Sequence, residues 1–206
     1  MKYVLILILF TMSNHAFAWD TLAEMDVDVC VALTNNAFLM SASFTNKLNM
    51  ACNSGSEEMK SEAYMLLSIH AYENFLNTAD SNWLRPEMFN ASNSVEAIGM
   101  HTNKWQFWMS RFLLAGACCS APNYERAYAL TTNSIHLLVS SGYTNRASMV
   151  EHAILRKYEM DGLDVADAMR VMAGMSAAEL GMGDVATNFA NQVSTPYRNI
   201  IFDFVR

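Results

Sequence analysis

The chain has 206 residues, of which 20 are acidic and 13 are Lys or Arg, and its formal net charge is −7 at pH 7. This acidic balance, without any cluster of basic residues, argues against nucleic acid and anionic membranes as partners. The length is typical of one domain with a single hydrophobic core.

The first segment of the chain, residues 1–18, has the pattern of a secretory signal peptide. Lys2 precedes an apolar run over 3–10, and a polar stretch leads to the small-x-small triplet at 16–18. The apolar run is too short to cross a bilayer, which takes about 20 residues. We therefore predict cleavage after Ala18 and a single domain over 19–206, either periplasmic or secreted, without a membrane span.

Four cysteines follow the predicted cleavage point: Cys30, Cys52, Cys118 and Cys119. An oxidising compartment favours disulfides over free thiols. A bond between the adjacent Cys118 and Cys119 would close a strained ring, so the sequence predicts that each pairs with Cys30 or Cys52, in an order that stays open. A thiolate metal site is the alternative, but it would lack the usual C-x-x-C spacing.

Composition and periodicity predict an all-α domain of six to eight helices, arranged as antiparallel helical hairpins. The chain contains only 3 prolines, and most long stretches lack glycine. A first helix is expected from about Thr21 to Met40, and a second begins near Ser56. The Asn-rich and Ser-rich pieces around 45–55 and 77–94 are typical of loops.

The next helix begins near Asn103 and carries the most aromatic stripe of the chain, which includes Trp105, Trp108 and Phe112. The spacing of this stripe, at three and four residues, is typical of a core helix. Trp105 and Trp108 are also candidates for partner binding, because tryptophan is enriched where proteins bind other molecules.

The second half of the chain predicts four more helices and a hydrophobic tail. Gly142 and Gly162 act as helix terminators, and the last helix stops before Pro196. Within the tail, Phe202 and Phe204 are candidates for a partner surface, although the tail could instead fold back over the helices. The four predicted helices cover 124–141, 145–160, 163–182 and 183–194.

Two short patches of the chain resemble tetratricopeptide-type repeats, which pair helices around small residues and bind protein segments in a concave groove. Gly116 followed by the stretch 123–127 resembles the turn and the second helix of such a repeat. In the other patch, the small residues are Gly174, Gly181, Ala186 and Ala190. The aromatic consensus positions and the spacing between the patches depart from the repeat. The resemblance therefore implies stacked hairpins rather than family membership.

The stretch VMAGMSAAELGMGD at 171–184 belongs to a chain with 16 methionines. On a helix, Met169, Met172 and Met175 share one side, and small residues occupy the opposite side. Flexible thioethers fill irregular gaps between helices, so packing is the predicted role, and no cofactor is expected. A copper site is the alternative, because thioethers select Cu(I).

The sequence contains none of the motifs that identify a nucleophile, a zinc protease, a phosphate loop or a thiol oxidoreductase. We therefore predict an exported binding protein, either an adaptor or an inhibitor that blocks a basic protein partner. A methionine-based copper protein and a carboxylate-dependent hydrolase are the alternatives. The hydrolase would draw its acid from Glu62, Glu73, Glu96 or Glu151, in a cleft lined by Trp105 and Trp108.

Overall fold

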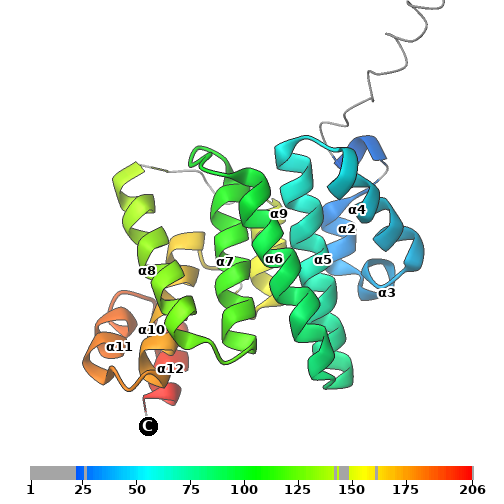
Figure 1. Cartoon of the computed structure of the whole chain (residues 1–206). Helices are drawn as coiled ribbons and strands as arrows, with labels where there is room; N and C mark the ends of the chain where they lie inside the picture. Colours follow the sequence, from blue (N-terminus) through cyan, green and yellow to red (C-terminus); the bar gives the residue numbers. More distant parts are fainter. Residues whose placement is uncertain (1–21, 26, 142, 144–148, 161, 206) are drawn as a thin grey trace, which may run out of the picture.

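The structure is a computed structural model that describes residues 22–25, 27–141, 143, 149–160 and 162–205. The predicted signal peptide and its cleavage site lie outside the described residues. The part of the chain that is described contains eleven α-helices, two short 3-10 helices and no strand (Figure 1). The all-α prediction is confirmed, whereas the predicted count of six to eight helices is wrong. None of the described helices is both long enough and apolar enough to cross a membrane.

The elements follow one another with short connections. The 3-10 helices are η1 (Leu22–Met25) and η2 (Ser81–Trp83). In the N-terminal half, the α-helices are α2 (Val29–Thr34), α3 (Asn36–Leu39), α4 (Ala42–Ser54), α5 (Glu57–Thr78), α6 (Leu84–Ile98) and α7 (Trp105–Ser120). In the C-terminal half, they are α8 (Tyr124–Ser141), α9 (Met149–Lys157), α10 (Val165–Glu179), α11 (Gly183–Ala190) and α12 (Thr195–Phe204).

The single helix predicted from Thr21 to Met40 is divided into η1, α2 and α3, because polar side chains start new helices inside it. The Asp28 side chain accepts a hydrogen bond from the Val31 N–H and begins α2. Asn35 has an extended backbone, and its side chain accepts from the Phe38 N–H to begin α3. Asp and Asn favour such capping positions over helix interiors.

The loops predicted at 45–55 and 77–94 are wrong, since most of these residues belong to α4 and α6. Asn and Ser are weak helix formers, but burial of a narrow stripe on each helix overrides their local preference. The buried stripe of α4 consists of Phe44, Leu48 and Ala51, and that of α6 includes Ala91, Ser94 and Ile98.

Each helix from α4 to α7 packs against the next helix in the chain, as expected for hairpins, and α10 packs against α7 and α8 (Figure 1). Helix α7 lies in the core, where Phe107, Trp108 and Phe112 are fully buried. The tail forms α12 and packs on α10. A Cβ atom at Gly174 would lie 2.7 Å from the Ile201 Cδ1 atom, so only glycine allows this approach.

The predicted disulfides are wrong, because all four cysteines are free. The Cys118 Sγ atom lies 3.9 Å from the Met88 Sδ atom on α6, and the Cys119 Sγ atom lies 3.7 Å from the Ser176 Oγ atom on α10. The other two thiols are placed on α2 and α4, which pack against α9 and α5. Burial also raises the pKa of Cys52 to about 12 and that of Cys118 to about 11, which suppresses the reactive thiolate.

Candidate functional site

Helix α8 separates two surface grooves. Its buried side is a narrow stripe of small residues, Ala127, Thr131 and Ser134, which face the core. The Asn123 side chain accepts a hydrogen bond from the Arg126 N–H at 3.3 Å and fixes the start of the helix. Because the buried stripe is narrow, most of the helix circumference remains available to line the surface on both flanks.

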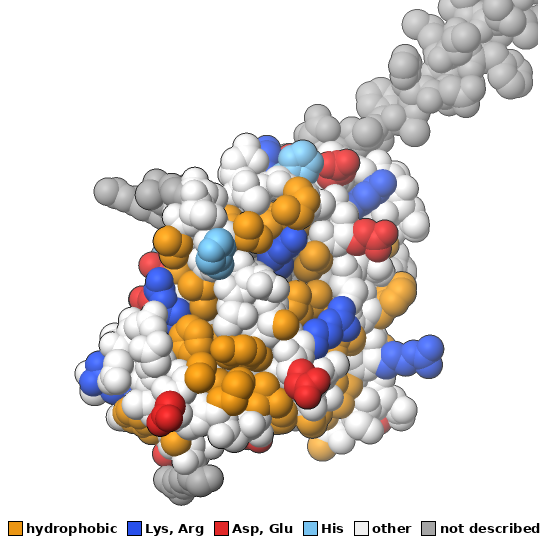
Figure 2. Space-filling model, turned by 60° about the vertical axis from the view of Figure 1, so that its left-hand side comes forward, with side chains coloured by type: hydrophobic (Ala, Val, Ile, Leu, Met, Phe, Trp, Pro, Cys, Tyr) orange, Lys and Arg blue, Asp and Glu red, His pale blue; other side chains and the backbone are white. Residues whose placement is uncertain are grey.

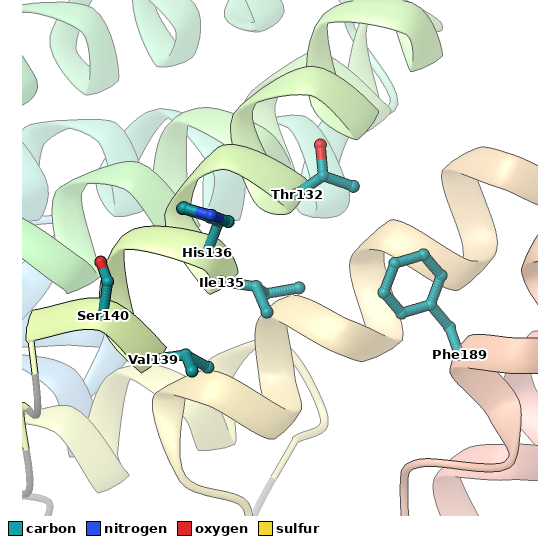
Figure 3. Close-up of a pocket in the computed structure, with 6 residues that line it drawn as sticks. All are labelled: Thr132, Ile135, His136, Val139, Ser140 and Phe189. Carbon is teal, nitrogen blue, oxygen red and sulfur yellow. The ribbon is translucent and has the colours of Figure 1, made fainter.

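The first groove lies between α8 and α11 and has a volume of about 350 Å³. Its lining is largely apolar: Ile135 and Val139 lie on α8, and Phe189 points toward them from α11 (Figure 3). His136 is the ionisable residue of this groove, and it is exposed. Thr132 and Ser140 complete the lining with hydroxyl groups. We call this surface the α8–α11 groove.

The second groove lies between α7 and α8 and has a volume of about 380 Å³. Two arginines line it, Arg111 from α7 and Arg126 from α8. The other lining residues are Met100, Ala129, Leu130, Asn133, Ser134 and Leu137. We call this surface the α7–α8 groove.

The third groove lies on the outer side of α6 and has a volume of about 520 Å³. Arg85 and the exposed Phe89 line it, together with Met88, whose Sδ atom lies 3.9 Å from the Arg126 Nη1 atom. Arg126 therefore connects this α6 groove with the α7–α8 groove. The remaining lining residues are Ser81, Leu84, Ser92 and Ala121.

The three grooves differ in charge from the chain as a whole. Their linings contain Arg85, Arg111 and Arg126 but neither Asp nor Glu. The chain as a whole, by contrast, has 20 acidic residues against 13 Lys and Arg. Figure 2 shows hydrophobic side chains gathered on one face of the molecule, with both basic and acidic side chains beside them. We call the surface formed by the three grooves the grooved face.

The residues proposed from the sequence for partner binding do not line the grooved face. Trp108 is fully buried, and its Nε1 atom donates to the Thr102 carbonyl oxygen at 3.1 Å. Trp105 is half-buried, whereas Phe202 and Phe204 are exposed on α12. The structure therefore leaves Phe202 and Phe204 on the surface but places Trp108 where a partner cannot reach it.

The three methionines considered for copper are packed among helices. Met169 and Met172 are buried in the core, and Met175 is partly buried. A Cβ atom on Gly116 would lie 3.3 Å from the Met172 methyl carbon, so this thioether fills space against α7. Throughout the described ranges, no group of three His, Cys, Asp or Glu side chains is placed to hold a metal ion.

The carboxylates considered for hydrolysis are separated from the grooves, since none of them lines one. The Glu73 Oε1 atom lies 3.0 Å from the Lys157 Nζ atom, and Glu73 Oε2 accepts from the Asn36 amide at 3.2 Å. Lys157 also donates to the Asn36 side-chain oxygen. Glu62 accepts from the Gln106 amide at 2.7 Å, and burial raises the pKa of Glu62. The other two carboxylates are Glu96, which is exposed on α6, and Glu151, which is buried on α9.

Sequence reasoning missed Glu87, a fully buried carboxyl group on α6. Its Oε1 atom accepts from the Ser120 hydroxyl at 3.4 Å, while Oε2 has no hydrogen-bond partner among the described residues. Burial raises the pKa of Glu87 to about 7. No sequence signal pointed to it, since it falls in the segment expected to be a loop. The Tyr158 hydroxyl is also buried without a hydrogen-bond partner in the described part of the chain.

No family model, curated protein or solved structure matches this chain. The resemblance of two patches to tetratricopeptide repeats therefore gains no support. Any assignment of function to this chain rests on its own side chains and surfaces.

Proposed function

We propose that the protein is an exported binding protein, and that it acts as an adaptor or inhibitor by holding a segment of a partner protein on the grooved face. One observation carries the proposal: each groove has one large, exposed hydrophobic side chain at its edge. These are Phe89, Met100 and Val139, which are 62%, 70% and 68% exposed. Contiguous apolar surface of this kind is typical of interaction sites.

The energetic benefit of covering these side chains supports binding. Removing apolar surface from water is worth roughly 25 cal/mol per Å², so burial of a few such side chains supplies several kcal/mol before the costs of association. The grooves are already present beside the exposed side chains, so a partner segment finds both surface to cover and depressions to fill.

The charge of the grooved face changes the expected partner. Net charge alone suggested a basic partner, because the chain is acidic. The three arginines and the lack of carboxylates in the groove linings favour instead a partner segment with acidic side chains. The proposed export of the protein rests on residues 1–18, whose sequence has the pattern of a secretory signal peptide.

The proposal is tested by a matched pair of triple variants. The groove variant carries Phe89→Ser, Met100→Ser and Val139→Ser, and the control carries Met50→Ser, Leu76→Ser and Met149→Ser. The three control positions are also exposed hydrophobics, on α4, α5 and α9, and none lines a described groove. Each protein is purified from the exported fraction of its own host and measured by native mass spectrometry.

We expect one heteromeric species with the wild type and the control, and its loss with the groove variant. The unfolding temperature of the groove variant should stay near that of the wild type, because exposed side chains contribute little to the core. A heteromer that survives the groove substitutions would refute the proposed face. A homomer that disappears with them would instead make the face an interface between copies of this chain.

A further inference from the structure

We infer that the α7–α8 groove is a carboxylate-binding subsite, in which Arg111 takes an acidic side chain of the partner segment and Arg126 adds a second positive charge. This inference deepens the proposed function and rests on it. It depends on what holds the two guanidinium groups, on the charges near them, and on the aliphatic character of the remaining lining.

Arg111 is held in place by neutral groups. Its Cζ atom lies 3.5 Å from the centroid of the Phe107 ring, and its Nη1 atom donates to the Phe107 carbonyl oxygen at 3.3 Å. Its Nη2 atom lies 4.0 Å from the Met100 Sδ atom. These contacts orient the guanidinium without neutralising it, and within the described ranges no carboxylate forms an ion pair with it.

The environment of Arg111 is costly for an isolated charge. The side chain is half-buried, and desolvation lowers the pKa of Arg111 to about 10. A cation that has lost part of its hydration and lacks a counter-charge is stabilised by any anion that enters beside it. The planar guanidinium has five N–H donors, so donors remain for a ligand after the contacts with Phe107 and Met100.

Arg126 brings a second positive charge to the same groove. It lies in the first turn of α8, and its side chain is exposed. Its side chain lies 3.9 Å from the Met88 sulfur, a weak acceptor. The guanidinium groups have different neighbours: Arg111 lies at Phe107, whereas Arg126 reaches Met88, which contacts Cys118 about three turns further along α7. Arg111 therefore presents the planar fork to a carboxylate, and Arg126 adds positive charge to the groove.

The remaining lining favours a carboxylate on an aliphatic stem over a free inorganic anion. Ala129, Leu130 and Leu137 supply apolar contact from α8. Such a surface covers the methylene groups of a glutamate side chain, whereas inorganic phosphate has no apolar part to bury. The volume of about 380 Å³ lies at the small end of ligand-site volumes and accommodates one side chain.

Glutarate, a dicarboxylate with three methylene groups, is the probe for this subsite. The full chain is titrated at constant ionic strength while the arginine Nε–Hε resonances are followed by NMR. We expect saturable shifts of the Arg111 and Arg126 signals. Arg111→Gln should weaken binding by about tenfold, the value of one charge-assisted hydrogen bond, and Arg126→Gln should weaken it less. Arg85→Gln removes the same charge from the neighbouring α6 groove and should change binding by less than about twofold.

Four outcomes would overturn the inference. Shifts that drift without saturation, or equal weakening by Arg85→Gln and Arg111→Gln, would mean general charge screening. Inorganic phosphate that binds as tightly as glutarate would refute the preference for a carboxylate with an aliphatic stem. Arg111→Lys keeps the charge but removes the guanidinium fork, so it should also weaken glutarate binding, and thermal unfolding checks that the variant remains folded. Failure of glutarate binding with the heteromer intact would refute this subsite alone, whereas the groove triple variant tests the proposed function itself.

Discussion

Replacing Glu87 by Gln should make the protein more stable in neutral and alkaline solution. The Glu87 carboxyl group is fully buried, and its pKa is about 7 in the folded protein against an ordinary value of 4.5. Because the folded state holds the proton more tightly than the unfolded state, the stabilisation is fully present below about pH 4.5. It is lost as the pH rises toward 7, where the buried group must ionise.

The size of this loss follows from the two pKa values. A rise from 4.5 to about 7 corresponds to roughly 3 kcal/mol of folding free energy lost above pH 7. The glutamine in Glu87→Gln would keep the shape of the side chain and could donate to or accept from the Ser120 hydroxyl, but it cannot ionise. The difference in unfolding free energy between Glu87→Gln and the wild type should therefore grow with pH. Above pH 7 it should be roughly 3 kcal/mol larger than at about pH 4.5.

Urea unfolding measured from about pH 4.5 to about pH 9 tests this expectation, because the difference between variant and wild type isolates Glu87 from all other titrating groups. Glu96→Gln is the matched control, since Glu96 lies on the same helix but is exposed. The effect of Glu96→Gln on the unfolding free energy should be much smaller than that of Glu87→Gln. Parallel curves for Glu87→Gln and the wild type would refute the reasoning and show that the buried carboxyl group is solvated.

Three further predictions follow from other contacts. Lys157→Met should cost about 3 kcal/mol of unfolding free energy, because it leaves the Glu73 carboxylate buried without its cation. In a double-mutant cycle, adding Glu73→Leu should recover most of this loss. Gly174→Ala should destabilise by about 1–3 kcal/mol, since its Cβ atom would meet the Ile201 side chain, and Ile201→Val added to it should restore part of the stability measured by thermal unfolding. When the protein is alkylated in denaturant without reductant, mass spectrometry should show that all four cysteines are modified. Pairs of cysteines that escape modification would show that disulfides form.

Elements with strong periodicity or a clear cap could be predicted from the sequence. Ser56 marked the start of α5, and its side chain accepts a hydrogen bond from the Met59 N–H. The aromatic stripe around Phe112 indicated α7 correctly. Helix α6 was missed, because its Asn and Ser residues suggest a loop until the burial of Ala91 and Ser94 by neighbouring helices is known. Propensity is local, but that burial depends on tertiary structure.

The grooved face could not be predicted for a similar reason. Phe89, Arg111 and Val139 come from α6, α7 and α8, and no spacing in the sequence relates them. The disulfide prediction was wrong because an oxidising compartment does not determine where a cysteine lies, and the Cys118 sulfur lies against Met88 on α6. Glu87 lay in a predicted loop, so its burial had no sequence signal. In each case, the missing information was which helix lies beside which.

The contacts of Lys157 with Glu73 and Asn36 bear on the order in which the chain folds. They join residues separated by 84 and 121 positions in the sequence, and α2 packs on the same helix, α9. Helices α4 to α8 can pair with their immediate neighbours by closing short loops, which is fast. The docking of α2 must wait for α9, because this partner is distant in the chain. Substitutions in α2 should therefore accelerate unfolding while leaving the refolding rate almost unchanged.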